Sequence, residues 1–281
     1  MSKLAKHHEE VGKTYDTSGL VTYGFDYEAT RLDRDVVEYA ITARYLDRYI
    51  PDGATVADVG VGVGHYSELL ARRGCALHLV DVAQRLLDTT VDRLRGAGLA
   101  DCIASVHHAS ATEMSGLPDG CCDAVLLLGP LYHLGDTGER NRAINEAARI
   151  LRPGGLVFAA GINRITYLWD LLHDAPDSVA DRAAFFASYL QDGNFDPPIE
   201  GYPPVVHLAT AAEFQGELNT AFEQLVMAGT ESFAGKLEPQ FLSASAESQA
   251  VWLDLVERTG TTAEGLGITD HFLYIGRVVK G

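Results

Sequence analysis

The sequence has 281 residues, of which 47% are hydrophobic, and a formal net charge of −17. A chain of this length can bury one sizeable core and carry an extra lobe, so we expect one domain with insertions. Because phosphate neutralisation supplies most of the affinity for nucleic acids, an acidic chain with scattered Lys and Arg argues against a DNA or RNA partner.

The cysteines and the first residues narrow the class further. Cys75, Cys102, Cys121 and Cys122 form no C-x-x-C pair, so we predict neither a metal site nor a disulfide framework. The N-terminal MSKLAKHHEE lacks an apolar signal region, and the longest apolar runs are only as long as strands. We therefore expect a soluble, cytoplasmic protein with no membrane partner.

The first 35 residues are polar and aromatic and show no long helical period. Tyr15, Tyr23, Asp26 and Glu28 lie in this segment. Two interpretations stay open: a surface arm whose rings pack on the body, or a lid whose rings and carboxylates contact ligands. Asp35 is then expected to cap a helix over residues 36–49.

Residues 55–64 read TVADVGVGVG, and the chain is organised around this stretch. A buried strand ending at Asp58 leads into glycines at every second position, and residues 65–73 follow with helical spacing. Such a loop lets the backbone approach a ligand near the N–H groups of the helix start. A nicotinamide-binding fingerprint would need its third glycine at the position of His65, so the spacing argues against that cofactor. The glycines of the loop are Gly60, Gly62 and Gly64.

Asp81 ends a second short strand, residues 76–80, about twenty residues after the glycines, the separation at which nucleotide-binding units place a carboxylate on ribose hydroxyls. No basic residue adjoins it to suit a ribose phosphate. The alternative is that Asp81 caps a helix over residues 83–94, and one carboxylate can do both.

Two further strands complete the ligand-binding edge. Residues 102–107 form the third strand, and residues 123–129 form a fourth that is apolar on both faces, as a central parallel strand should be. Ligands bind at the carboxyl ends of such strands, so Leu128, Gly129 and His133 should border the reacting centre.

The remaining chain predicts one more central strand and two insertions. A helix over residues 140–151, starting from Asp136 or Thr137, precedes a fifth strand at 156–160. Residues 194–204 read as a proline-stiffened loop. A capping box, Thr210 with Glu213, starts a helix expected to include Phe222 and Leu225. Later strands are expected at 225–229 and 272–279. The aromatic residues of the insertions, expected mostly to form lid core, are Trp169, Phe185, Phe186, Tyr189 and Trp252.

The segments VADVGVGVG, LVD, DAVLLLGPLYHL and ARILRPGGLVFAA, in this order, resemble class I S-adenosylmethionine (SAM)-dependent methyltransferases that act on small molecules. The resemblance covers roughly residues 55–160. It implies an α/β fold, a Rossmann-like, seven-stranded, mostly parallel sheet with helices on both faces. A mainly helical lid would come from the N-terminal arm, residues 1–35, and from C-terminal insertions at about 162–208 and 239–262 within the methyltransferase domain, residues 36–281.

The resemblance also implies a SAM site. In this family an aspartate usually accepts from the adenine amino group, and Ser110 stands there in this chain. YEATRL resembles a lid motif in which Glu28 and Arg31 flank an aromatic residue, here Ala29, and Tyr15 and Arg31 would close over the methionine end. The predicted cofactor-binding residues are Tyr15, Arg31, Asp58, Gly60, Gly62, Gly64, Asp81, Val82, Ser110, Ala111, Thr112, Leu128 and Gly129. Candidate catalytic residues are His133, Tyr23 and Asp26.

The expected function is methyl transfer from SAM to a small specialised metabolite of natural product biosynthesis. An aromatic or nitrogen-heterocyclic acceptor, indole-like and methylated on carbon or nitrogen, suits the aromatic lid and acidic arm. The alternative, O-methylation of a phenol or carboxylate, should need a base or a cationic clamp near the pocket. A non-catalytic SAM-binding sensor or scaffold is the alternative from another class. Whether the chain forms a homo-oligomer stays open, and His271 is interpreted as structural.

Overall fold

The computed structural model describes residues 3–18, 24–180, 182–195 and 206–279. A nine-stranded sheet forms its centre. Five parallel strands run in the order β3-β2-β1-β4-β5; β9 pairs antiparallel with β5, and β8 pairs antiparallel with β9. The bounds of these seven strands are β1 Thr55–Val59, β2 Ala76–Asp81, β3 Ile103–His108, β4 Cys122–Leu127, β5 Leu151–Asn163, β8 Phe222–Gly229 and β9 His271–Val278. The predicted Rossmann-like, mostly parallel sheet is confirmed.

Two short strands extend the sheet beyond the seven expected. β7, Val206–Ala209, pairs parallel with the end of β5, and β6, Asn194–Phe195, pairs antiparallel with β7. Ile162 of β5 pairs with both Leu208 and His271, so β7 and β9 lie on opposite edges of β5. Residues 194 and 195 were predicted to be loop; the rest of that predicted loop, 196–204, lies outside the described residues.

Successive side chains of the central strands point to opposite faces of the sheet and belong to two separate apolar clusters. Ala57, Val59 and Val125 belong to one apolar cluster, and their neighbours Val56 and Ala124 belong to the other, because successive side chains of a strand point to opposite faces. Apolar side chains of α6 Thr137–Ile150 and α9 Ala211–Leu218 complete the first cluster. The second is completed by α3 Val36–Tyr49, α4 His65–Ala71, α5 Gln84–Gly96 and α11 Ala246–Gly260. Helices therefore cover both faces, as predicted.

The segment before residue 35 is more helical than the sequence indicated. It forms α1 Lys3–Asp16 and α2 Phe25–Arg34. Val11 and Tyr15 of α1 pack with Val63 and Leu86 of the body. Because α1 carries few apolar side chains, the sequence shows no helical periodicity there, and the prediction missed the helix. Asp35 lies before α3, but its side chain caps nothing; its Oδ2 lies 3.7 Å from Arg31 Nη1 instead.

Element boundaries shifted where strand pairing outweighed local signals. Phe222, predicted helical, belongs to β8, since β8 pairs with β9 from Phe222 to Gly229. Leu225, predicted both at helical spacing and as the start of a strand, lies in the same strand. The fifth strand starts at Leu151, five residues before its predicted start at residue 156, and includes Gly154 and Gly155; a register shift against β4 accommodates the extra residues. The predicted caps by Asp136 and by the Thr210–Glu213 box are confirmed.

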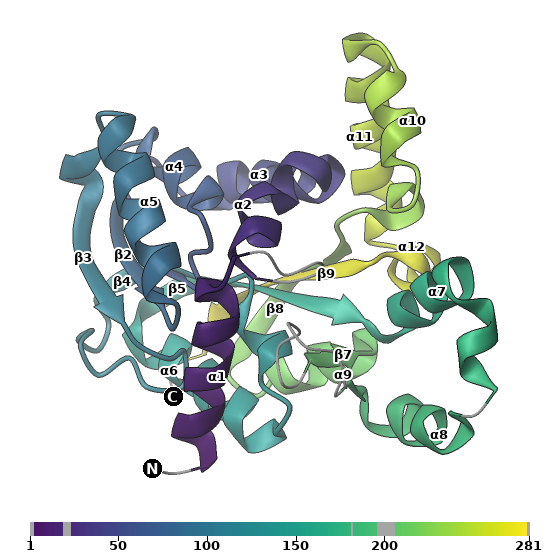
Figure 1. Ribbon diagram of the computed structural model, residues 1–281. Helices are drawn as coiled ribbons and strands as arrows, with labels where there is room; N and C mark the ends of the chain where they lie inside the picture. The colour runs from purple at the N-terminus through teal and green to yellow at the C-terminus, as the bar shows by residue number, and fades with distance from the viewer. Residues whose placement is uncertain (1–2, 19–23, 181, 196–205, 280–281) are drawn as a thin grey trace.

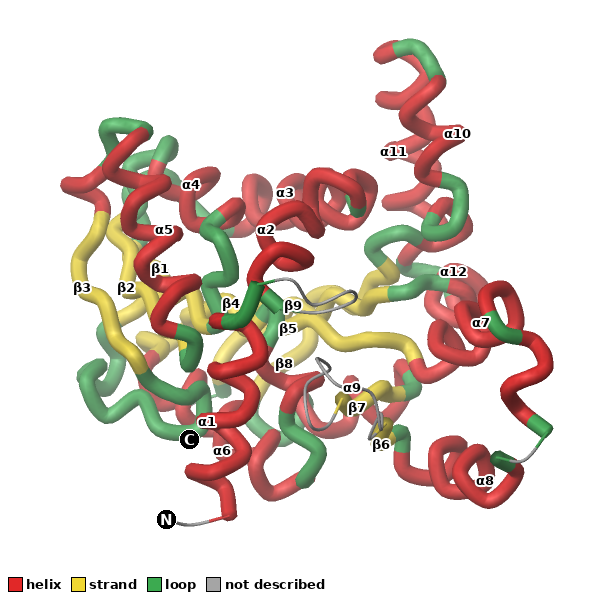
Figure 2. The backbone as a smooth tube through the Cα atoms, in the orientation of Figure 1, coloured by secondary structure: helices red, strands yellow, loops and turns green. Residues whose placement is uncertain are grey.

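The C-terminal insertions lie to one side of the sheet (Figure 1). α10 Glu238–Ser243 and α11 project together from the body, while α7 Arg164–Asp174 and α8 Ala183–Asp192 form a separate lobe beyond α12 Ala263–Ile268. Figure 2 shows β3, β2, β1 and β4 far from these helices, whereas β6 and β7 lie on the side of α8. Tyr189 is buried, but Trp169 and Trp252 are 57% and 45% exposed, so the expectation of lid core is wrong for both tryptophans.

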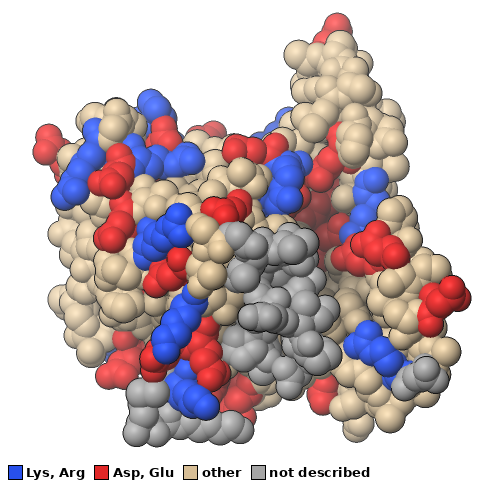
Figure 3. Space-filling view, viewed as in Figure 1, with Lys and Arg blue, Asp and Glu red and all other residues tan. Residues whose placement is uncertain are grey.

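On the face seen in Figure 3, groups of Asp and Glu lie beside groups of Lys and Arg among uncharged residues, so the acidic charge is not confined to one area of that face. Among the described helices, none has both the length and the apolar character required to cross a bilayer.

Candidate functional site

The glycine loop joins β1 to α4 at the carboxyl edge of the sheet. Gly60, Gly62 and Gly64 have φ values of +78°, +55° and +83°, which side chains disfavour. Their surroundings also leave no room: a Cβ on Gly62 would lie 2.7 Å from Glu28 Oε1, and one on Gly60 would lie 2.9 Å from the Pro130 ring. The loop therefore packs directly under α2 and the segment after β4.

A cavity of about 690 Å³ opens beside this loop, over the ends of β1, β2 and β4. α1 forms one wall: a Cβ on Gly12 would lie 2.5 Å from the Val82 carbonyl oxygen, so the helix seats closely on the body. Predicted cofactor residues that line the cavity are Tyr15, Gly60, Gly62, Asp81, Val82, Ser110, Ala111 and Gly129.

Asp81 has the environment expected of a ribose ligand. Its Oδ1 accepts from Ala83 N at 2.8 Å and its Oδ2 accepts from Gly62 N at 3.4 Å, while the carboxylate still borders the cavity. Burial raises its pKa to about 7, although both N–H groups oppose the change. Asp81 thus holds the start of α5 and the glycine loop at once, so its two predicted roles are compatible.

Beyond Asp81, Ser110 Oγ accepts from Thr112 N at 3.2 Å and lies 3.4 Å from His8 Nε2. Ser110 and Ala111 line the cavity, and Thr112 lies behind them, buried. α1 therefore contributes to this wall through His8, which no motif in the sequence indicated.

A second hollow, of about 410 Å³, continues from the first along the edge of the sheet. Asp58 in it is buried and accepts from Ser67 Oγ at 2.6 Å; burial raises its pKa to about 6. Arg31 Nη1 pairs with Glu38 Oε2 at 2.6 Å, and Arg31 Nε lies 3.5 Å from Glu28 Oε2. Burial lowers the pKa of Arg31, but these carboxylates outweigh it and the guanidinium stays charged. The hollow thus offers both signs of charge, and Leu128 and Gly129 also line it.

The candidate catalytic residues lie in different environments. His133 is buried; its Nε2 pairs with Tyr15 Oη at 2.9 Å, its carbonyl oxygen lies 2.7 Å from His7 Nε2, and its Nδ1 makes no hydrogen bond in the described part of the chain. Burial lowers its pKa to about 3, so the ring is neutral at physiological pH. Asp26 is exposed, accepts from Ser18 Oγ at 3.1 Å, and lines neither hollow. Tyr23 lies outside the described residues.

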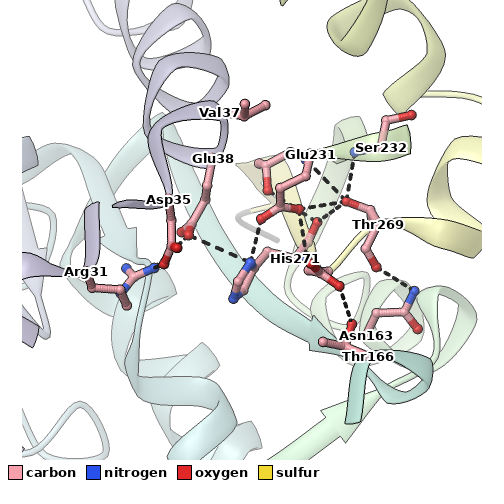
Figure 4. A network of polar contacts seen from close by, with 12 residues as sticks. Arg31, Asp35, Val37, Glu38, Asn163, Thr166, Glu231, Ser232, Thr269 and His271 are labelled. Atoms are coloured by element: carbon pink, nitrogen blue, oxygen red, sulfur yellow. Dashed lines mark hydrogen bonds and ion pairs between the residues drawn. The ribbon is translucent and has the colours of Figure 1, made fainter. Parts of the chain in front are cut away.

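Sequence reasoning missed a polar cluster beside a third hollow, which Glu38 and His271 line (Figure 4). Glu38 of α3, Glu231 after β8 and His271 at the start of β9 meet there. Burial lowers the pKa of His271, but Glu38 and Glu231 outweigh it and raise the value to about 10. One feature of the sequence could have located His271. It starts the last strand, and a strand that runs antiparallel to β5 starts at the edge where the parallel strands end.

Known proteins share this fold and these motifs. A family model described as a methyltransferase domain matches residues 57–159. Methyltransferase GfsG of Streptomyces halstedii is 30% identical over 212 residues, which cover 71% of this chain and 72% of that protein. A ubiquinone biosynthesis O-methyltransferase of Caulobacter vibrioides is 32% identical over 113 residues, or 40% of this chain and 42% of that one, so this match spans less than half of the enzyme.

Among solved structures, N-methyltransferase NodS from Bradyrhizobium japonicum WM9, in complex with S-adenosyl-L-homocysteine (SAH), has a TM-score of 0.55. The match covers 98% of this chain and 99% of that one at 14% identity, and at that identity it shows the fold alone. The GfsG match extends well beyond the domain model and covers most of both chains. The chain therefore belongs to the class I SAM-dependent methyltransferases, whose methyl donor is SAM.

Proposed function

We propose that this protein transfers the methyl group of SAM to a small-molecule acceptor bound beyond the second hollow. The observation that carries the proposal is a continuous series of hollows along the carboxyl edge. The first and second share Gly60, Gly62 and Gly129, and the second and a third share Tyr66 and Leu128. A long ligand would occupy the first two, and an acceptor would approach its sulfonium from the side of the third.

The charged residues of the first two hollows suit SAM in one orientation. Asp81 in the first cavity would accept from the ribose hydroxyls, and Ser110 and Ala111 would contact the adenine. In the second hollow, Arg31 would bind the methionine carboxylate, and Asp58 or Glu28 would accept from its ammonium group. The sulfonium, which joins these two parts of SAM, would then lie near Gly129, where the first cavity meets the second hollow.

The reaction asks little of the protein beyond alignment. The methyl group on a sulfonium is already activated, so the enzyme must hold the nucleophile behind it, in line with the breaking C–S bond, and exclude water. α1 and α2 cover the hollows in the way such exclusion needs: Tyr15 pairs with His133, and Glu28 lies over the glycine loop. A lid role for residues 1–35 is part of this proposal.

Two acceptor classes follow from the walls of the third hollow. Glu38 and His271 lie there, and they supply the charged groups whose apparent lack in the sequence counted against O-methylation. We therefore favour an aromatic acceptor with an acidic O–H group, such as a phenol. The ring of Tyr66 and the Glu38 carboxylate also suit an indole-like nitrogen heterocycle, which is the second candidate.

Turnover of methyl-labelled SAM over a panel of phenols, carboxylic acids, indoles and amines tests this proposal. We expect label in one acceptor class and equimolar SAH, with an Asp81→Ala variant as the binding-deficient control. SAM binding without transfer to any class would favour the sensor alternative. A nucleotide titration in which NADH binds and SAM releases no heat would refute the proposal.

A further inference from the structure

Three side chains from distant segments meet beside the third hollow (Figure 4). His271 Nδ1 lies 2.6 Å from Glu231 Oε1 and 3.7 Å from Glu38 Oε2. One nitrogen or oxygen from each of the three residues lies within 4.8 Å of the others. Glu231 and Glu38 are only 3% and 6% exposed, so the two carboxylates are held together away from bulk water. The imidazole of His271 and the guanidinium of Arg31 supply the positive charge beside them.

The cluster sits where this fold binds ligands. His271 pairs with Ile162, so it lies beyond the carboxyl end of the parallel strands, and Glu38 and His271 line the third hollow, of about 200 Å³. Tyr66 and Thr42 line the same hollow, and the buried Tyr66 hydroxyl lies where it can bind a polar ligand in the hollow.

Outer contacts fix each carboxylate. Glu231 Oε2 accepts from Thr269 Oγ1 at 2.8 Å and from His271 N at 2.9 Å, and Glu38 accepts from Arg31. Ser232, next to Glu231, has a φ of +49°, a value that non-glycine residues adopt at a cost. Metal sites show such outer contacts, which orient their ligands.

We propose that Glu38, Glu231 and His271 bind one divalent cation, and that this cation takes the acceptor's oxygen as a further ligand. The second half rests on the proposed function. Ligands about 2.1 Å from a metal lie about 3 Å from one another, so the three groups would move by less than about 1 Å. The cation would displace the proton that His271 carries between the two carboxylates, and two carboxylates with the resulting neutral imidazole carry a charge that a divalent cation balances. Mixed oxygen and imidazole ligands suit Mn²⁺, although the sequence predicted no metal site.

The cation would assist the transfer without a redox step. Bound to it, the acceptor's O–H group releases its proton to water. An oxygen lone pair then forms the O–CH₃ bond as the C–S bond breaks, and that electron pair stays on sulfur. The products are the methyl ether or ester, SAH and one proton.

Titration of the EDTA-treated, full-length protein with Mn²⁺, followed by the loss of the free-ion electron paramagnetic resonance signal, tests the site. We expect one Mn²⁺ per chain, bound more than about 100-fold more weakly by Glu231→Gln and His271→Gln, and about 10- to 100-fold more weakly by Thr269→Val. Mn²⁺ is preferred to Zn²⁺ here because His78, Cys121 and Cys122 form a softer group elsewhere.

The exposed pair of His173 and Asp174 offers a matched control, since its Nδ1–Oδ1 distance is also 2.6 Å. His173→Gln should bind Mn²⁺ like the wild type. SAH affinity, measured on every variant, reports folding and the donor site separately from the metal. If the wild type binds no Mn²⁺, or if Glu231→Gln binds it unchanged, the cluster is an ion pair only and the proposal is wrong.

Discussion

Replacing Asp81 by Asn should stabilise the ligand-free protein at high pH while weakening cofactor binding. The carboxyl of Asp81 is buried, and its pKa rises from an ordinary 3.8 to about 7. Between those values the folded protein keeps a proton that the unfolded chain releases. Its stability therefore falls as pH rises through that window, by at most ~4 kcal/mol, and Asn has no proton to lose.

Chemical denaturation at pH 5 and pH 8 measures this effect. From pH 5 to pH 8 the free energy of unfolding of Asp81→Asn, relative to wild type, should rise by roughly 2–3 kcal/mol. Asp92→Asn, which removes a 77% exposed carboxylate, should show no comparable change. An equal difference at both pH values would refute the reasoning that burial governs this carboxyl.

Although Asp81→Asn should stabilise the ligand-free protein at high pH, it should weaken cofactor binding. A hydrogen bond to a charged group contributes about 1.5–3 kcal/mol, so Asp81→Asn should bind SAH about 10- to 150-fold more weakly at pH 8. Calorimetry with SAH and with its 2′-deoxy and 3′-deoxy analogues checks the cause. One analogue lacks the hydroxyl that Asp81 contacts, and Asp81→Asn should bind that analogue nearly as tightly as it binds SAH. If the variant instead binds both analogues much more weakly than SAH, Asp81 does not contact the ribose.

Other predictions concern the loop and the walls of the hollows. Gly62→Ala, with φ at +55° and Glu28 Oε1 2.7 Å from the new Cβ, should lower the unfolding free energy by about 1–3 kcal/mol and weaken SAH binding, measured by denaturation and calorimetry. Since burial holds the pKa of His133 near 3, its ring stays neutral from pH 5 to pH 8, and His133→Asn should leave the shape of the pH–rate profile unchanged over that range; a lost limb would show that His133 titrates during turnover. Arg31→Lys should weaken SAH binding by about tenfold, because Lys cannot hold Glu38 and a methionine carboxylate in one plane; equal calorimetric affinity would contradict that role.

The sequence by itself determined the central half of this protein. Apolar runs, the glycine loop and Asp81 follow local rules, so strand, turn, helix and the carboxylate that we propose as the ribose ligand were placed from spacing alone. The same rules predicted the capping box at Thr210, and the structure confirms it. These features depend on residues close in the chain, where periodicity and backbone conformation carry the information.

Only the tertiary structure determined which segments cover the pocket and which residues meet at the proposed acceptor site. α1 shows little apolar character, and its place over the pocket depends on contacts such as Tyr15 with His133, 118 residues apart. Glu38, Glu231 and His271 meet because β9 runs antiparallel to β5 and returns its first residue to the edge near α3. No local pattern encodes an encounter among three segments so far apart. Sheet order and strand direction fix it, and those arise from packing of the whole chain.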